Sequence, residues 1–244
     1  MRAPRIHTDA PLQAGQKTEL TGNPCNHVAR VLRLQPGAEL VLFNGDGRDY
    51  PGVIETVTRK AVTVAISGAV DPATESPLAI ELGQVVSRGD RMDYAVQKSV
   101  ELGVTRIQPL TSERCEVRLK GERAEKRQRH WQQVAVSAAE QCGRARVPEV
   151  LPLMALDEWI NQCHQHDQRL VLHENCDQPL QSLTTPSSLA LLIGPEGGLN
   201  NQELEKARTA GFLATTFGPR TLRTETAPVT ALSICQWLWG DMSR

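Results

Sequence analysis

Two short apolar runs near the end of the sequence each finish in a turn rich in glycine and proline. The first run ends at Ile193 and continues as Gly-Pro-Glu-Gly-Gly over residues 194–198; the second ends at Phe217 and continues as Gly-Pro-Arg. Short apolar runs of this kind are typical of strands buried in a parallel sheet. Open α/β sheets bind ligands at the carboxyl ends of their strands, so residues 188–227 are predicted to hold a binding site.

The chain alternates between expected strands and helices from residue 78 onward. Strands are expected at residues 78–86, 104–110, 169–173, 189–193 and 213–217, and helices at 90–102, 122–142, 156–163 and 226–239. A further helix is predicted from Asn200, whose spacing from Glu203 is that of a capping box, to Gly211. This alternation predicts an α/β fold in which a mostly parallel sheet carries helices on both faces.

The first 70 residues show a different pattern, because they contain mostly expected strands. Residues 40–43 and 53–66 contain alternating or β-branched runs, and Asn44-Gly45-Asp46-Gly47 between them is a strong hairpin signal. Residues 26–34 show helical spacing, and Pro36-Gly37 ends that pattern. We therefore expect a small β-barrel with one short helix, followed by a polar linker at residues 67–77.

Net charge is only −1, but it is distributed unevenly. Residues 86–148 carry 13 Lys/Arg against 8 Asp/Glu, a net of +5, whereas residues 149–244 carry 6 against 11, a net of −5. A basic middle segment is compatible with a phosphate-binding surface, although a solvated helix face gives the same pattern. Aromatic residues make up 4% of the chain, which disfavours a single-strand binder built on base stacking.

Cysteine usage and hydropathy favour a cytoplasmic protein. The six cysteines are scattered without the spacing of a disulfide framework, so reduced thiols are expected. The N-terminal residues lack the apolar region of a signal peptide, and no window approaches the roughly 18 apolar residues of a membrane span.

The turn at residues 194–198 is not a phosphate-binding loop. It matches neither the dinucleotide glycine fingerprint nor the P-loop, and it has no lysine to reach phosphates. Its glycines instead leave backbone groups open to close approach by a flat ligand such as adenine. In the second turn, Arg220 and Arg223 are candidates for stabilising an anion beside that ligand.

Four motifs in this order carry a specific resemblance. They are RMDYAVQKSVELGV at residues 91–104, AAEQCGRARVPEV at 138–150, LLIGPEGGL at 191–199 and FGPRTLRTETA at 217–227. Together they resemble the ribosomal RNA small subunit methyltransferase E family of the SPOUT superfamily. The similarity extends through RVLRLQPG near the N-terminus and runs over nearly the whole chain.

The resemblance implies a PUA-like RNA-binding β-barrel at residues 1–72 and a SPOUT domain with a trefoil knot at residues 73–244. It also implies a homodimer through the knotted domain. The implied reaction is methylation of N3 of one uridine in 16S ribosomal RNA, with S-adenosyl-L-methionine (SAM) as cofactor. The implied SAM pocket contains Leu172, His173, Glu174, Ile193, Gly194, Pro195, Glu196, Gly197, Gly198, Leu199, Gly218, Leu222, Arg223 and Ala227.

Methylation at uridine N3 requires removal of a proton and stabilisation of a uracil anion. Positive charge from an arginine can stabilise the developing anion, and our candidates are Arg144 and Arg223. Glu140 or Glu225 could accept the proton, although carboxylates at helix ends more often act as caps.

RNA contacts are expected from the N-terminal domain and from the basic run at residues 114–129. The candidates in the N-terminal domain are Arg5, His27, Arg30 and Arg33, which can neutralise phosphates without contacting bases. The partner is then 16S ribosomal RNA or the small ribosomal subunit, with no membrane.

One pair of motifs has the spacing of zinc ligands: Cys163-x-x-His166 and His173-x-x-Cys176. However, Cys163 falls at the end of an expected helix and His173 at the end of an expected strand, and the family supplies no metal. We therefore expect no metal.

Three other functions remain open at this point. A different RNA methyltransferase of the same superfamily, such as a ribose 2′-O enzyme, would share the fold. A non-catalytic RNA-binding or assembly factor would keep the fold without the activity. A dinucleotide oxidoreductase is disfavoured because its phosphate fingerprint is absent.

Overall fold

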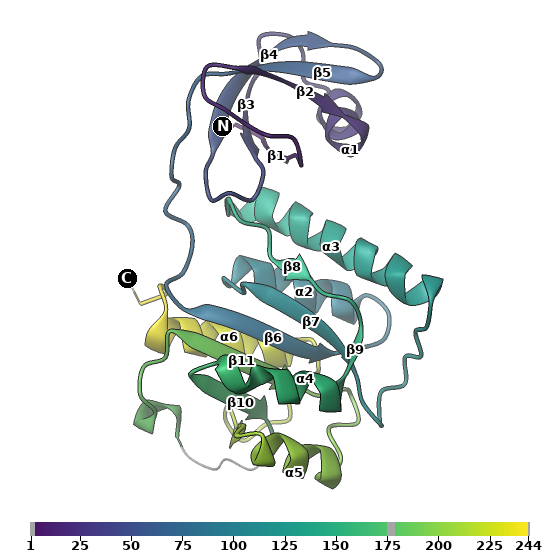
Figure 1. Cartoon of the computed structure of the whole chain (residues 1–244), viewed down its shortest axis with the longest axis vertical. Coiled ribbons are helices and arrows are strands. Elements are labelled where there is room, and N and C mark those ends of the chain that lie inside the picture. Colours follow the sequence, from purple (N-terminus) through teal and green to yellow (C-terminus); the bar gives the residue numbers. More distant parts are fainter. Residues whose placement is uncertain (1–2, 175–178, 244) are drawn as a thin grey trace. The chain divides into compact units, whose positions relative to one another are not determined.

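The computed structural model describes residues 3–174 and 179–243, which form two compact units. The first unit contains the residues up to Glu75 together with Ala139–Val147, and the second contains the rest (Figure 1). The first unit thus ends three residues beyond the expected domain boundary and takes in a segment from the middle of the chain. Residues 67–77 contain no helix or strand, but Ser67 donates to the Pro51 carbonyl (2.8 Å) and Val70 pairs with Asp49.

The first unit is built on a five-stranded sheet in the order β1-β3-β4-β5-β2. These strands are β1 (Arg5–His7), β2 (Lys17–Thr21), β3 (Glu39–Phe43), β4 (Tyr50–Val57) and β5 (Ala61–Ile66). β1 is parallel to β3 and the other pairs are antiparallel. Buried and partly exposed residues alternate along β5, because successive side chains in a strand point to opposite faces. The buried residues of this sheet and of the adjoining helical segment form one apolar core.

The helical segment of the first unit begins and ends earlier than the sequence predicted. It consists of α1 (Gly22–Asn26) and the π-helical turn η1 (His27–Val31), in which Leu32 donates to the His27 carbonyl (2.9 Å). The expected start was wrong because Pro24 fits the first turn of a helix, where its missing N–H costs no hydrogen bond. Arg33 has a φ of 53° and lies beyond the helix, so it does not share a helical face with His27 and Arg30.

The second unit contains a seven-stranded sheet with the order β12-β10-β11-β6-β7-β8, and β9 also pairs with β7. The strands are β6 (Ala79–Val85), β7 (Arg106–Thr111), β8 (Glu149–Val150), β9 (Met154–Ala155), β10 (Gln168–Leu172), β11 (Ser188–Ile193) and β12 (Leu213–Thr215). Every strand pair of this sheet within the described residues is parallel. The expected parallel α/β fold is therefore confirmed.

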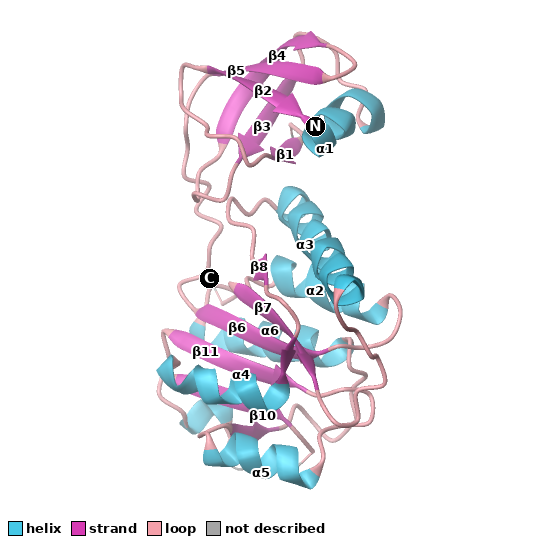
Figure 2. Cartoon of the chain, turned by 45° about the vertical axis from the view of Figure 1, so that its right-hand side comes forward, coloured by secondary structure: helices cyan, strands magenta, loops and turns pink. Residues whose placement is uncertain are grey.

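Helices cover both faces of this sheet (Figures 1 and 2). They are α2 (Arg91–Glu101), α3 (Glu122–Cys142), α4 (Leu156–Gln162), α5 (Asn201–Thr209) and α6 (Thr226–Trp239), with short 3₁₀ turns η2 (Cys163–Gln165) and η3 (Leu180–Ser182). α4 and α5 pack together on one face, and α2 and α6 pack together on the other. The bounds of α3 and α6 are those that the sequence predicted. None of the helices in the described residues has the length and apolar character needed to cross a membrane.

A close approach between β6 and α4 sets how tightly the helix packs on the sheet. Gly83 lies in the central strand β6, and the buried Trp159 of α4 covers it. A Cβ atom added at Gly83 would lie 2.4–2.8 Å from atoms of the Trp159 ring. The indole also donates to the Glu81 carboxylate (2.7 Å) and contacts the Phe212 ring, with 5.7 Å between ring centroids. Glycine at position 83 is therefore required by contact with the indole.

We expect Gly83→Ala to lower the free energy of unfolding by about 1–3 kcal/mol, because the added methyl group overpacks the interface with Trp159. Chemical denaturation of the purified protein measures this change. Gly68→Ala is the matched control, since a Cβ there meets nothing within 4 Å. An equal loss of stability in both variants would contradict the role given to Gly83.

Candidate functional site

A cavity of about 830 Å³ lies where three strands of the second unit end. Its lining comes from residues 172–174 after β10, residues 193–199 after β11 and residues 216–227 after β12, together with Arg91 and Arg114. The parallel register places Leu170 beside both Leu191 and Leu213, so these strands end at one edge of the sheet. Every residue that the resemblance suggested for the cofactor pocket lines this cavity, as do Arg223 and Glu225.

The turn after β11 is closed by its own backbone. Gly198, at a φ of 67°, donates its N–H to the Pro195 carbonyl (2.9 Å). A Cβ atom at Gly194 would lie 3.2 Å from Cγ of Leu199 and 3.3 Å from its nitrogen, which is tighter than ordinary packing. The expected capping box then starts α5: Glu203 N–H donates to the Asn200 side chain (2.8 Å), and Asn200 N–H donates to the Glu203 carboxylate (2.9 Å).

One buried hydroxyl joins the two turns to the central strand. Thr224 Oγ1 donates to the Gly194 carbonyl (3.1 Å) and accepts from Nε2 of Gln84 on β6 (3.3 Å). Thr224 and Gln84 are both buried. Two residues on, α6 begins, and the N–H groups of Thr226 and Ala227 both donate to the Arg223 carbonyl (2.9 Å). Thr224 therefore holds the two cavity turns in a fixed relation.

An arginine from the start of α2 lies between two carboxylates of the lining. Arg91 donates to Oε1 of Glu196 (3.1 Å), and its Nε lies 3.9 Å from Oε2 of Glu225. The N–H of Arg88 donates to the same Glu196 oxygen (3.1 Å). Burial acts to raise the pKa of Glu196, but hydrogen bonds from backbone N–H groups and from Arg91 outweigh it and hold that pKa below its usual value. Glu196 is therefore an ionised carboxylate whose charge is well compensated.

Other charged groups of the lining have fewer contacts. Arg114 donates to the Gly197 carbonyl (3.1 Å). The exposed side chains of Arg220 and Arg223 form no ion pair with any described residue. Such guanidinium groups can stabilise an anion that develops on a bound substrate. Arg91 was not among the predicted pocket residues, although it opens the first motif of the resemblance, whereas Arg220, predicted to stabilise an anion beside the ligand, does line the cavity.

Arg144 and Glu140, the other two catalytic candidates, belong to the first unit and do not line the cavity. Arg144 is buried, and its guanidinium donates to the Glu75 carboxylate through NH2 (2.6 Å) and Nε (3.1 Å). Glu140 accepts from the N–H of His7 (2.9 Å) and lies 3.8 Å from Nδ1 of His27. Both side chains therefore connect the segment Ala139–Val147 to the N-terminal residues of the first unit.

The candidates for RNA contact differ in exposure. Arg5 is buried, where it pairs with Asp49, donates to the Arg144 carbonyl (3.0 Å) and lies over the Phe43 ring. His27 is partly exposed, whereas Arg30 and Arg33 are exposed. In the second unit, Arg114, Arg118, Lys120, Arg123, Lys126 and Arg129 of the basic run are also exposed.

The zinc-type motifs are only partly described. The Cys163 thiol is buried and donates to the Trp159 carbonyl (3.3 Å), and burial raises the pKa of that thiol, with a smaller contribution from Glu81. His173 lines the cavity, and Cys176 lies outside the described residues. Within the described ranges, no three His, Cys, Asp or Glu side chains are placed to hold a metal ion.

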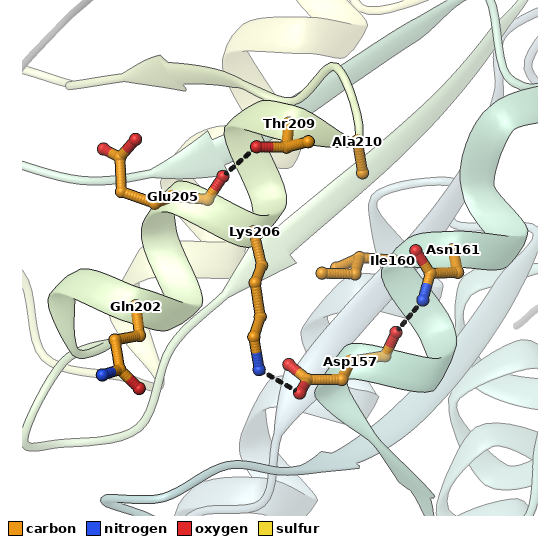
Figure 3. Close-up of a pocket in the computed structure, with 8 residues that line it drawn as sticks. All are labelled: Asp157, Ile160, Asn161, Gln202, Glu205, Lys206, Thr209 and Ala210. Atoms are coloured by element: carbon orange, nitrogen blue, oxygen red, sulfur yellow. Dashed lines mark hydrogen bonds and ion pairs between the residues drawn. The ribbon is translucent and has the colours of Figure 1, made fainter.

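A second cavity, of about 640 Å³, lies between α4 and α5 (Figure 3). Its polar groups are largely engaged with one another: Lys206 pairs with Asp157, Asn161 donates to the Asp157 carbonyl (2.8 Å), and the Thr209 hydroxyl donates to the Glu205 carbonyl (2.8 Å). None of the predicted site residues lines it. The cavity at the strand ends is therefore the candidate functional site.

Comparison with known proteins connects both units to RNA methyltransferases. A family model described as an RNA methyltransferase domain matches residues 74–236, and one described as an RNA methyltransferase PUA domain matches residues 20–67. Ribosomal RNA small subunit methyltransferase E of Buchnera aphidicola subsp. Schizaphis graminum is 33% identical over 243 residues, which covers 99% of each chain.

Two solved structures are similar over nearly the whole chain. Ribosomal RNA small subunit methyltransferase E of Neisseria gonorrhoeae, bound to SAM, is 40% identical with a TM-score of 0.92, covering 99% of this chain and 100% of that one. A Legionella pneumophila protein described as a methyltransferase, also with SAM bound, is 40% identical with a TM-score of 0.95 and the same coverage.

We expect Thr224→Val to lower the free energy of unfolding by about 1–3 kcal/mol, because it leaves the Gly194 carbonyl and the Gln84 amide without their shared partner. The matched control is Thr221→Val, an exposed threonine of the same turn, for which a change within about 0.5 kcal/mol is expected. Chemical denaturation checks both values. A neutral Thr224→Val would mean that the hydroxyl does not join the turns.

Proposed function

This chain belongs to the ribosomal RNA small subunit methyltransferase E family, and from that premise we propose that it uses SAM to methylate N3 of a uridine in 16S ribosomal RNA. One observation supports this most strongly. The residues matched to the family's cofactor pocket come from three separate segments of the sequence, yet all of them line one cavity.

The cavity fits SAM in size and in chemistry. Its volume of about 830 Å³ lies in the range of small-molecule sites. At Gly194 a side chain would crowd Leu199, so glycine leaves the backbone accessible to a flat adenine ring. Oε2 of Glu225 is buried without a hydrogen-bond partner among the described residues, which suits a cationic ligand. SAM supplies the reactive methyl group when it is bound.

Side chains of this lining can perform the proton chemistry at uridine N3. The guanidinium of Arg223 stabilises the negative charge that develops on O2 or O4 as N3 loses its proton. The Glu225 carboxylate accepts that proton. Arg144 and Glu140 are the alternative pair, but their side chains are occupied by Glu75 and His7 in the first unit. We therefore give the two roles to Arg223 and Glu225.

RNA binding is proposed to involve both units. Arg30 and Arg33 are exposed on the first unit and can neutralise phosphates, and the partly exposed His27 is a third candidate for RNA contact. Arg5 is less suited because its guanidinium already contacts Asp49 and Phe43. The exposed basic residues at 114–129 provide the corresponding charge on the second unit, where Arg114 also lines the cavity. The substrate is 16S ribosomal RNA, free or in the small subunit, in the cytoplasm.

A homodimer through the second unit is the proposed assembly. Trp237 on α6 is 60% exposed and Tyr94 on α2 is 46% exposed, and these two helices pack against each other. Large exposed aromatic side chains are typical of surfaces that a partner covers. The trefoil knot expected from the resemblance remains a prediction of that resemblance.

For the activity, we expect the purified protein with SAM to methylate 16S ribosomal RNA and Arg223→Ala to lower kcat about 100-fold or more, because the uracil anion loses its positive partner. The affinity for SAM, measured by calorimetry, should change by less than about threefold. Mass spectrometry of the digested RNA identifies the methylated atom.

Arg208→Ala, which removes a partly exposed arginine of α5 outside the cavity, is the control and should keep normal turnover. Methylation of a ribose oxygen would contradict the proposed reaction, and full turnover of Arg223→Ala would remove that residue from the mechanism. Arg144→Ala is compared in the same assay; a stable variant with low turnover would transfer the role to Arg144.

For the assembly, we expect Trp237→Arg to convert a dimer into a monomer, because it places a charge in the apolar contact. Light scattering after size-exclusion chromatography measures the molar mass. Val53→Arg, which changes an exposed apolar residue of the first unit, should remain dimeric. A dimeric Trp237→Arg variant, or a monomeric wild type, would contradict this assembly.

A further inference from the structure

The Glu225 carboxylate is a partly buried negative group of the cavity whose charge is poorly compensated. Its side chain is 18% exposed, and Oε2 accepts no hydrogen bond from any described residue. The nearest cation, Nε of Arg91, lies 3.9 Å from Oε2, which is beyond hydrogen-bonding distance. A desolvated carboxylate oxygen without a donor is costly in a folded protein, so a positively charged ligand group would stabilise it.

Glu196 shows the contrasting arrangement in the same wall. It accepts from both Arg91 and the Arg88 N–H, each at 3.1 Å. Arg91 therefore directs its hydrogen bond to Glu196 and leaves Glu225 with a weaker, longer contact. Among these three side chains, one arginine faces two carboxylates, and its shorter contact with Glu196 leaves the charge of Glu225 the less compensated of the two.

SAM offers two cationic groups to such a carboxylate: its sulfonium and its α-ammonium. An ammonium brings three N–H donors and needs several acceptors. Three carbonyls of the turn after β11 already accept one hydrogen bond each, Gly194 from Thr224 (3.1 Å), Pro195 from Gly198 (2.9 Å) and Gly197 from Arg114 (3.1 Å), so each has only one lone pair left for an ammonium. A sulfonium has no donor and is stabilised by charge alone, which is what Glu225 provides.

We propose that Glu225 recognises the sulfonium charge of the cofactor and so makes the site select SAM over its demethylated product, S-adenosylhomocysteine, whose sulfur is a neutral thioether. The inference rests on the proposed function, because it takes SAM as the cofactor. It adds a determinant of cofactor selectivity that the fold and the motifs do not specify.

The charges balance through the reaction. The nitrogen pair at N3 forms the N–CH₃ bond, the S–CH₃ bond breaks with its electron pair moving to sulfur, and Glu225 takes the N3 proton. The sulfonium and the carboxylate both become neutral, so the attraction that held the cofactor is absent from the product complex. Glu225 thereby also favours product release.

Calorimetric titration of the full-length protein with SAM and, separately, with S-adenosylhomocysteine tests this role. We expect Glu225→Gln, which keeps the shape and removes the charge, to weaken SAM binding about tenfold and S-adenosylhomocysteine binding less than about twofold. Glu225→Asp retains the charge and should keep a preference for SAM. A thermal unfolding curve for each variant confirms that it is folded.

Glu205→Gln is the matched control for loss of a carboxylate. Glu205 lies on α5 at the second cavity, where Figure 3 shows its carboxylate directed away from Asp157 and Lys206, and it pairs with Arg208 (3.0 Å). Its affinities for both ligands should equal those of the wild type.

Three results would overturn the inference. An equal loss of affinity for both ligands in Glu225→Gln would show that the carboxylate holds the shared ammonium, and no loss for either would show that it contacts no cation. In both cases SAM still binds the wild type, so the proposed function stands. A wild type that binds no SAM would overturn the proposed function and this inference together.

Discussion

The parallel pairing of β10 with β11 and β12 is the constraint on which the site depends. Parallel strands end at the same edge of a sheet, so the turns that follow Leu172, Ile193 and Thr215 converge although they are far apart in sequence. Strand pairing ends there and leaves backbone groups that need partners. The Thr224 hydroxyl supplies one of these partners by accepting from Gln84 on β6 and donating to Gly194. The cavity is therefore a consequence of how the sheet terminates.

The charge that the cavity presents to a ligand depends on which of its charged side chains form ion pairs with one another. Glu196 is held by Arg91 and by a backbone N–H, whereas Glu225 has only a distant guanidinium and Arg223 forms no ion pair with a described residue. A charged group that has no close partner in the folded protein is available to a ligand. The free energy lost by removing that group from water is offset only when a ligand of opposite charge binds. Methyl transfer to a uridine needs a cation near the developing anion and a carboxylate near the proton and the sulfonium, and Arg223 and Glu225 are charges of the lining that remain available for these roles.

Much of the fold could be predicted because its signals are local. The spacing of apolar residues indicates α3, Asn200 with Glu203 gives the start of α5, and the bounds expected for α6 are also those observed. β8 and β9 were missed because two residues cannot show a periodicity, and they exist only by pairing with β7. The join of Ala139–Val147 to the first unit was also missed, because it depends on contacts such as Arg144 with Glu75, 69 residues apart.

Arg144 and Arg223 show why residue type and motif membership do not identify a catalytic group. Both stand in motifs of the resemblance, and both follow a glycine within a few residues. The difference is tertiary: the guanidinium of Arg144 is buried against Glu75, whereas that of Arg223 is exposed in the cavity lining. Transition-state stabilisation requires a charge that the protein has not already neutralised. Whether an arginine is already neutralised depends on long-range contacts in the folded chain. An arginine is therefore a candidate for catalysis when the fold gives it no carboxylate partner.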